Sequence, residues 1–293
     1  MFISIDTWCL KNYGSVEKVI ALLKESGFDA YDYTFGEPGF ADEFFLFDDY
    51  LERAKKLRAF ADGLGIACNQ THAPFPTWLP SYKKIPSWVG ATDHESYNAK
   101  MFKDIVRSLE VSAILGAKVC VVHPANDASA EENAEFYKRL EPVARRVGVK
   151  IGLENMWNRT PDGKNCAAAC SHHEDFAKHL SLLPADVFVA CLDIGHAEMS
   201  GLDTSAVEMI YALKDRLAAL HIHDNDKVND SHRLPYTMAI DFEQILTALK
   251  EVNYRGDVTF ETSYFALPFP LETYPAVASL LASVAKYMRS RLN

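Results

Sequence analysis

Short runs of apolar residues alternate along the chain with longer segments in which apolar residues recur at helical spacing. The short runs fit buried strands, and the longer segments fit amphipathic helices. The strand-like runs are residues 2–5, 29–35, 66–71, 118–122, 149–153, 187–192, 217–222 and 257–260. The helical segments that follow them are residues 15–26, 48–64, 94–115, 130–147, 173–183, 204–213, 242–252 and 276–289. Within the fourth of these helices, Pro142 predicts a kink or a break.

Eight alternations of strand and helix predict a parallel sheet that is covered on its outside by helices. In a chain of 293 residues, eight such units predict a closed (β/α)8 TIM barrel, an α/β fold that spans residues 1–293 as one domain. An open doubly wound sheet is the alternative, but no glycine-rich phosphate loop follows the first strand. Residues 74–93 predict an irregular loop that is long enough to be functional, and residues 157–171 predict a second long loop that is polar.

Residues with metal-binding side chains stand where most of the strands end. In chain order they are His72, His123, Glu154, Asp193, His221 and Glu261. Singly, each is more often a hydrogen-bonded structural residue or a helix cap, but strand ends converge at one mouth of a barrel. So many carboxylates and imidazoles would be costly to bury together without a cation. This mixture of ligands suits Mn²⁺, Zn²⁺, Co²⁺ or Mg²⁺ and does not choose among them.

Charge and composition narrow the classes of function. The formal net charge of −10 argues against a large nucleic-acid surface, because phosphate backbones favour Lys and Arg, but it permits a small anionic substrate. No secretory signal and no run long enough for a membrane helix stand in the sequence, so we expect a cytoplasmic protein without a membrane partner. Cys166 and Cys170 lie close together, and we favour free thiols there over a disulfide or a soft-metal site.

Several segments together make the chain resemble the xylose-isomerase-like barrel superfamily. They are Thr71-His72-Ala73-Pro74, Leu192-Asp193-Ile194-Gly195-His196, the stretch from His221 to Asp226 with Asp230 and His232 behind it, Asp241-Phe242, Tyr254-Arg255-Gly256 and Phe260-Glu261. This group includes sugar and sugar-phosphate isomerases, ketose 3-epimerases, inosose dehydratase and endonuclease IV. The resemblance covers nearly the whole chain. One departure is the segment Arg233–Met238, which lacks the Gly-Glu-Gly common at this point of the superfamily.

The resemblance implies a set of metal ligands. In the isomerases and epimerases one divalent metal is held at the positions of Glu154, Asp193, His221 and Glu261, and the position of His196 contacts substrate. The pattern of endonuclease IV, which binds three zinc ions, would add His72 and His123 for one ion and His196, Asp230 and His232 for another, with Glu154 bridging. For Asp230 and His232, a hydrogen-bonded loop is as good an interpretation as a metal site.

The leading hypothesis is a metal-dependent isomerase or epimerase of a small sugar or polyol. Glu154 and Glu261 would be its acid–base pair, and His196 would orient a substrate hydroxyl. His72 and Trp157 are further candidates for substrate contacts, and apolar walls could come from Trp8, Phe75, Trp78, Trp88 and Trp157. The alternatives are a multinuclear phosphodiesterase of the endonuclease IV type, a dehydratase of the inosose type, and a non-catalytic sugar-binding barrel. A homo-oligomer is compatible with each of them.

Overall fold

The computed structural model describes residues 1–35, 47–85 and 91–292, so Trp88 lies outside the described residues. The barrel strands are β1 (Ile3–Ile5), β2 (Ala30–Thr34), β3 (Ala67–His72), β4 (Val119–Val121), β5 (Lys150–Glu154), β8 (Phe188–Asp193), β9 (Leu217–His221) and β10 (Val258–Phe260). The surrounding helices are α1 (Val16–Ser26), α2 (Tyr50–Leu64), α3 (His94–Leu115), α4 (Ala130–Val147), α5 (His173–Ser181), α7 (Ala206–Leu213), α8 (Phe242–Glu251) and α9 (Tyr274–Leu292).

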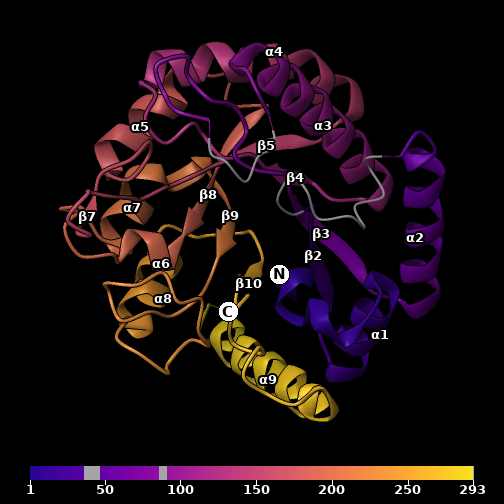
Figure 1. Ribbon diagram of the computed structural model, residues 1–293. Helices are drawn as coiled ribbons and strands as arrows, with labels where there is room; N and C mark the ends of the chain where they lie inside the picture. The colour runs from indigo at the N-terminus through magenta and orange to yellow at the C-terminus, as the bar shows by residue number, and fades with distance from the viewer. Residues whose placement is uncertain (36–46, 86–90, 293) are drawn as a thin grey trace.

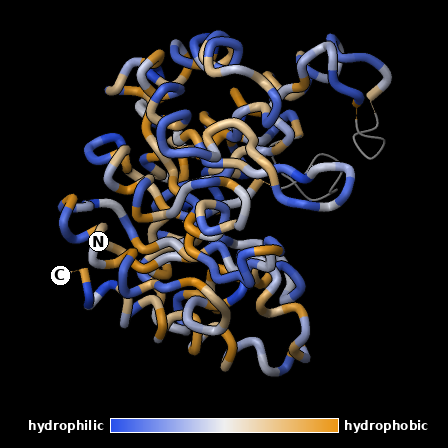
Figure 2. Tube along the Cα trace, turned by 90° about the vertical axis from the view of Figure 1, so that its left-hand side faces the viewer, coloured by the Kyte–Doolittle hydropathy of each residue, from blue (hydrophilic) through white to orange (hydrophobic). Residues whose placement is uncertain are grey.

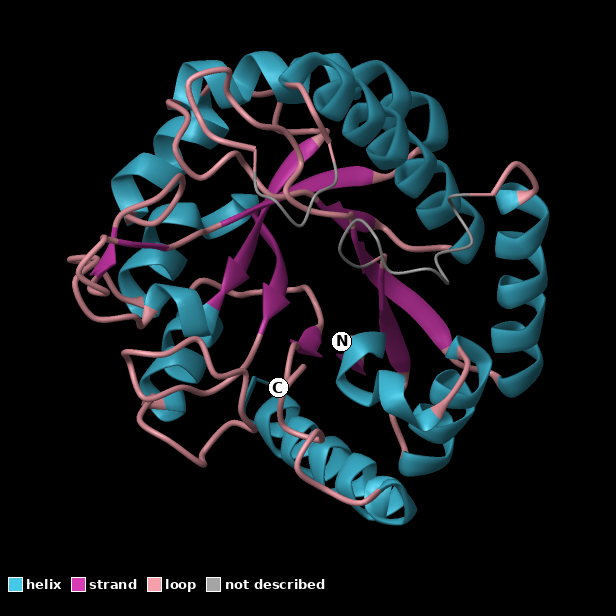
Figure 3. Ribbon diagram, viewed as in Figure 1, coloured by secondary structure: helices cyan, strands magenta, loops and turns pink. Residues whose placement is uncertain are grey.

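Eight parallel strands close into a ring within the described parts of the chain, and the helices lie around it (Figures 1 and 3). Six strands pair in the order β2-β3-β4-β5-β8-β9, and β1 pairs with β10. Two parallel bridges join these sheets: Ile222 pairs with Phe260 beside β9 and β10, and Asp6 pairs with Asp32 beside β1 and β2. The predicted closed (β/α)8 barrel is therefore confirmed.

Local sequence signals account for the helix ends. Helix α4 begins at a capping box in which Ser129 and Glu132 satisfy each other's backbone N–H groups, and it ends at Gly148 in the left-handed conformation. Of the two outcomes expected at Pro142, a kink or a break, the break is wrong, because α4 continues through it as one helix. Residues 157–171, for which we expected a long polar loop, contain a small antiparallel hairpin of β6 (Asn158–Arg159) and β7 (Asn165–Cys166). Cys166 and Cys170 are both free thiols, as expected.

Alternate residues of the strands face the barrel interior, and this register decides where the site forms. Val119, Val121, Val189, Cys191 and Ala219 form a small apolar cluster that is separate from the large core between strands and helices. Side chains of a strand alternate between its faces. The next inward positions on β4, β8 and β9 are therefore residues 123, 193 and 221, which are His, Asp and His. The strands thus carry apolar residues inside the barrel and potential ligands at its mouth.

The side view in Figure 2 places both chain ends at one end of the barrel. Because Ile3 begins β1, this is the end at which the strands start, opposite the mouth. No helix in the described ranges combines the length and apolar character that a membrane crossing requires.

Candidate metal centre

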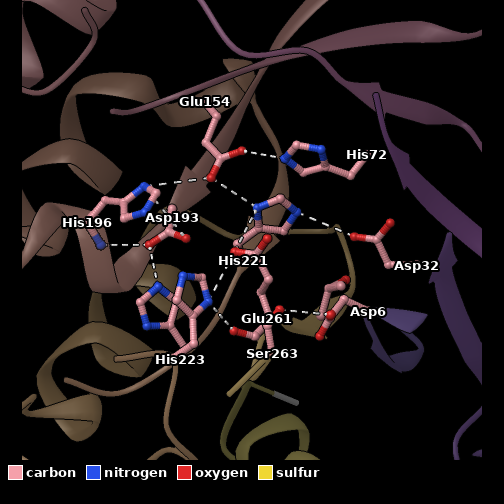
Figure 4. Close-up of polar contacts among 12 residues, drawn as sticks. Asp6, Asp32, His72, Glu154, Asp193, His196, His221, His223, Glu261 and Ser263 are labelled. Atoms are coloured by element: carbon pink, nitrogen blue, oxygen red, sulfur yellow. Dashed lines mark hydrogen bonds and ion pairs between the residues drawn. The ribbon is translucent and has the colours of Figure 1, made fainter. Parts of the chain in front are cut away.

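The six ligands predicted from strand ends stand at the carboxyl ends of barrel strands, whereas His196 lies in α6 (Ile194–Ala197) and Asp230 and His232 lie in the loop after β9. His72, Glu154, Asp193 and His221 are the last residues of β3, β5, β8 and β9, and His123 and Glu261 lie just beyond β4 and β10. Figure 4 shows most of these side chains pointing toward one another, with Glu154 between His72, His196 and His221. The structure thus brings together residues that are far apart in sequence, as the barrel hypothesis predicted.

Glu154, Asp193, His221 and Glu261 form the first cluster, in which one donor atom from each residue lies within 4.8 Å of the others. His221 Nδ1 is 3.2 Å from a Glu154 oxygen and 3.6 Å from a Glu261 oxygen. Glu154 and Asp193 each keep a buried oxygen, and His221 keeps Nδ1, without a hydrogen-bond partner among the described residues. Buried polar atoms of native proteins are nearly always satisfied. The donor set and its orphaned atoms therefore fit a divalent cation.

Two neighbouring residues orient this cluster. Asp32 on β2 lies 3.4 Å from His221 Nε2, on the opposite side of the ring from Glu154 and Glu261. A carboxylate behind a metal-binding imidazole fixes the ring and strengthens it as a ligand. The Asn155 side chain accepts a hydrogen bond from the Asp193 N–H and donates one to the Asp193 carbonyl, which fastens the ends of β5 and β8. The sequence reasoning assigned no role to either residue, since both depend on tertiary contacts.

His72, His123 and Glu154 form a second cluster. The two Nε2 atoms are 2.8 Å apart, and Glu154 Oε2 lies 3.4 Å from that of His72 and 3.1 Å from that of His123. His72 Nδ1 is 2.8 Å from the Ala73 carbonyl. Because a carbonyl only accepts, this contact places a proton on Nδ1 and leaves the His72 Nε2 lone pair facing the cluster.

A third cluster joins His196, Asp230 and His232 with His223, a residue to which the sequence reasoning gave no role. His223 could have been found by its register, because it stands two residues beyond the inward-facing His221. The remaining nitrogen of His196 faces Asp230 at 3.3 Å, since its Nδ1 is committed to the Asn155 carbonyl. That nitrogen can serve a substrate hydroxyl or a metal, but not both.

The charged groups of the site shift each other's pKa values in opposite directions. Burial raises the pKa of Glu154, but the neighbouring His221 and His123 outweigh it and hold that pKa well below its usual value. Burial also raises the pKa of Glu261, and here His221 and His232 offset it only in part, so the pKa stays above the usual value. Two carboxyl groups with pKa values driven apart are the arrangement that acid–base catalysis needs.

A cavity of about 510 Å³ opens directly onto these residues. Glu154, Glu261, His72, His123 and His196 face it. Its remaining wall is largely apolar and includes Trp8, Phe75, Pro76, Trp78, Leu79, Met156, Trp157 and Tyr264. Those predicted aromatic wall residues that the structure describes, Trp8, Phe75, Trp78 and Trp157, therefore lie at the cavity. Its volume suits a small organic ligand.

The family model for the xylose isomerase-like TIM barrel matches residues 20–284. The chain belongs to this family. Among curated proteins it is similar to the uncharacterized protein y4fM of Sinorhizobium fredii, at 24% identity over 82% of this chain and 79% of the relative. It is also similar to the uncharacterized protein MJ1311 of Methanocaldococcus jannaschii, at 28% identity over 65% of this chain and 62% of the relative.

Solved structures with similar folds include sugar epimerases. A D-tagatose 3-epimerase-like protein superposes with a TM-score of 0.72 at 20% identity, over 100% of both chains. The 3-keto-D-glucoside 4-epimerase YcjR of E. coli has a TM-score of 0.69 at 19% identity, over 97% of this chain and 99% of that one. An IolI protein with a bound zinc atom has a TM-score of 0.70 at 17% identity, over 100% of this chain and 98% of that one. At these levels of sequence identity, the structural similarity establishes the fold alone.

Proposed function

We propose that this chain is a cytoplasmic, divalent-metal-dependent isomerase or epimerase of a small sugar or a sugar phosphate. The observation that carries the proposal is the first cluster, in which Glu154 and Glu261 both lie near His221 Nδ1 at the edge of the cavity. A cation held by Glu154, Asp193, His221 and Glu261 would stabilise negative charge on neighbouring substrate oxygens. The names of two structural neighbours, D-tagatose 3-epimerase-like protein and D-psicose 3-epimerase, support a ketose as the substrate.

The two glutamates would exchange protons with the substrate. One carboxylate takes the proton from the carbon next to a carbonyl, and the other carboxyl returns a proton to the opposite face or to the neighbouring atom. Without a metal the pKa of Glu154 lies below its usual value and that of Glu261 lies above it, and a bound cation would favour the ionised form of both carboxyl groups. The cavity wall around Trp8, Trp78 and Trp157 would exclude water and pack against the apolar face of a sugar.

The test is turnover in deuterated water. A panel of ketoses, their phosphates and inosose would be incubated with the chain and Mn²⁺ or Zn²⁺, and products would be analysed by mass spectrometry and NMR. We expect an isomerised or epimerised product that carries deuterium at the carbon next to the carbonyl. Loss of water from inosose would identify a dehydratase. Conversion without any deuterium in the product would contradict proton transfer through the glutamates.

A second candidate is phosphodiester hydrolysis by several metal ions, and one observation favours it. The cluster of His72, His123 and Glu154 adds ligands beside the first cluster that a one-metal isomerase does not need. The net charge of −10 opposes a nucleic-acid substrate. We therefore expect no cleavage of a duplex with an abasic site. Efficient, metal-dependent nicking that weakens steeply with salt would replace the isomerase proposal with this one.

A further inference from the structure

The barrel interior has an apolar part and a polar part below the ligands. The apolar part is the small cluster that β4, β8 and β9 contribute. On the strands β1, β2, β3 and β10 the corresponding side chains are polar, and none is more than 3% exposed: Ser4, Asp32, Gln70 and Thr259. Gln70 and Thr259 each stand two residues before a predicted ligand, on the same face of their strand. Because buried polar groups are nearly always hydrogen-bonded, their partners indicate what this polar part does.

The Thr259 hydroxyl is the centre of the polar network. Its oxygen accepts hydrogen bonds from the Ser4 hydroxyl at 2.8 Å and from the Asn69 amide at 3.0 Å. A hydroxyl has two acceptor lone pairs and one proton, so these two bonds leave only the proton to be placed. Thr259 donates it to Gln70 Oε1 at 3.3 Å. The network therefore determines which end of the Gln70 amide is the oxygen.

The nitrogen of the Gln70 amide faces the residue that supports His221. Gln70 Nε2 donates to Asp32 Oδ2 at 2.9 Å and to the Leu220 carbonyl at 3.4 Å. A carbonyl only accepts, so the nitrogen of the amide must lie on this side. The same Asp32 oxygen lies 3.4 Å from His221 Nε2. A single amide thus connects the barrel interior to the carboxylate behind the metal ligand.

The Asp32 carboxylate depends on this one hydrogen bond for its orientation. Within the described parts of the chain, Asp32 Oδ1 is buried and unpaired, and Gln70 is the one donor to Oδ2. Rotation of a carboxylate about its last torsion is soft, so the side chain alone does not select an orientation. Without the Gln70 amide, the oxygen near His221 would be free to turn away from the ring.

A bulge in β3 makes room for this arrangement. Asp32 pairs with Gln70, whereas the residue before Asp32 pairs with Cys68, so Asn69 is an extra residue in β3. Successive side chains of a regular strand point to opposite faces, but a bulge can re-aim one of them. Asn69 and Gln70 are neighbours in sequence, yet both form hydrogen bonds with Thr259. The bulge also places Gln70 directly beside Asp32.

We propose that Gln70 and Thr259 are positioning residues that hold Asp32 against His221 and so strengthen the binding of the ion at the first cluster. Neither is among the described residues that line the cavity, so both would act only through Asp32. A fixed carboxylate behind His221 Nε2 keeps Nδ1 directed at the other ligands and makes it a stronger donor. The inference rests on the metal-binding part of the proposed function and not on the reaction.

Metal affinity tests the proposal without reference to activity. Metal-free full-length chain would be titrated with Zn²⁺ against a chelating dye, and the ion that Asp193→Asn loses would be taken as the ion of the first cluster. Gln70→Leu removes the amide at similar volume, and we expect it to weaken this ion's binding by up to ~10-fold, the lower end of the effects of supporting groups. Thr259→Val removes the proton that orients the amide and should weaken binding less, while Thr259→Ser should restore it.

Thr71→Val is the matched control for a buried hydroxyl. Thr71 follows Gln70 on β3, but its hydroxyl bonds with Ser112 of α3 on the other face of the strand. Thr71→Val should therefore keep the affinity of the wild type even if it lowers stability. Equal weakening by Thr71→Val and Thr259→Val would overturn the proposal, because it would show a general effect of lost buried hydroxyls.

A double-mutant cycle shows whether Gln70 acts through Asp32. In Asp32→Asn the supporting carboxylate is already gone, so adding Gln70→Leu should weaken binding no further. Fully additive losses would overturn the proposal, as would unchanged affinity in Gln70→Leu and Thr259→Val. Thr259→Val hardly changes the side-chain volume, so it decides the matter even where Gln70→Leu does not fold.

Nitrogen NMR of the zinc-loaded wild type needs no variant. With ¹⁵N-labelled histidine, His221 Nδ1 should give a metal-bound signal, and Nε2 should keep its proton because it faces Asp32. A metal-bound Nε2 would overturn the proposal. A wild type that binds no ion at the first cluster would overturn the metal-binding proposal and this one together, whereas normal binding with unchanged affinity in the variants would overturn the positioning role alone.

Discussion

Two buried aspartates stand at different positions around the barrel mouth and differ in the sign of their pKa shift. Asp193 ends β8 and Asp6 follows β1, and neither side chain is more than 1% exposed. Burial raises the pKa of Asp193, but His196 and His223 outweigh it and lower that pKa below its usual value. Burial, assisted by Asp32, raises the pKa of Asp6 to about 6. Equal burial thus accompanies opposite pKa shifts, because imidazoles surround one carboxyl and a carboxylate adjoins the other.

The two aspartates belong to two regions of the barrel mouth that have different roles. The ends of β5, β8 and β9 and the residue after β10 bring carboxylates and imidazoles together, which suits a cation. Asp6, which follows β1, lies beside Asp32 in the middle of β2, and Asp32 in turn supports His221 from behind. The first region would hold the ion, and the second would hold its ligands in place (Figure 4). Substitutions in these two regions should therefore have different effects on the protein.

The largest effect should come from removing the ion or from Asp193→Asn. Chelation should abolish turnover, and Mn²⁺ or Zn²⁺ should restore it, because the proposed reaction needs an electrophile at the first cluster. Asp193→Asn should also lose turnover, since a neutral amide is a poorer ligand than a carboxylate. Assays of metal content and activity check both. Asp6→Asn is the matched control and should keep its metal. Full activity in metal-free protein would mean that the first region does not act through a bound ion.

The next largest effect should come from replacing either glutamate with glutamine. Glu154→Gln and Glu261→Gln keep the side-chain length and one oxygen but remove the basic carboxylate. Loss of an acid–base group typically lowers the rate by ~10²–10⁴-fold, so we expect kcat to fall by that factor. Metal affinity should fall much less than in the corresponding alanine variants. Wild-type turnover by both glutamine variants, with metal still bound, would place the proton transfer elsewhere.

Asp32→Asn should have a smaller effect, confined to metal binding. The Asp32 carboxylate lies 3.4 Å from His221 Nε2 and accepts a hydrogen bond from Gln70 at 2.9 Å. Loss of such a supporting group typically weakens metal affinity by ~10–100-fold. Competition titrations with a chelating dye measure this. Asp104→Asn, which changes a buried aspartate on α3, is the matched control. Equal affinity in Asp32→Asn and wild type would mean that Asp32 does not support the ligand.

Much of this arrangement could be predicted from the sequence, for a physical reason. Buried strands read as apolar runs, and the period of two then places residues 72, 123, 154, 193, 221 and 261 at one mouth. The pattern within a single strand does not predict the contacts between different strands and helices. The support of His221 by Asp32 and the room that Gly195 leaves for His223 arise only when distant segments pack. The β6–β7 hairpin was missed because its strands have two residues each and no apolar pattern.

The smallest effect on turnover should come from Asp6→Asn, which tests the other half of the comparison through stability. Asp6 Oδ2 accepts hydrogen bonds from the Cys9 N–H and the Ser263 hydroxyl, while Oδ1 is buried and unpaired among the described residues. Its pKa is about 6 in the folded chain against an ordinary value of 3.8. The native state therefore binds its proton more tightly, so its contribution is fully present below pH 3.8 and is lost as pH rises through about 6. A shift of this size corresponds to at most about 3 kcal/mol.

Urea unfolding of metal-free protein between pH 4 and pH 8 should show the wild type losing stability relative to Asp6→Asn as pH rises. A difference that does not vary with pH would mean that Asp6 stays ionised throughout, and the contrast with Asp193 would fail.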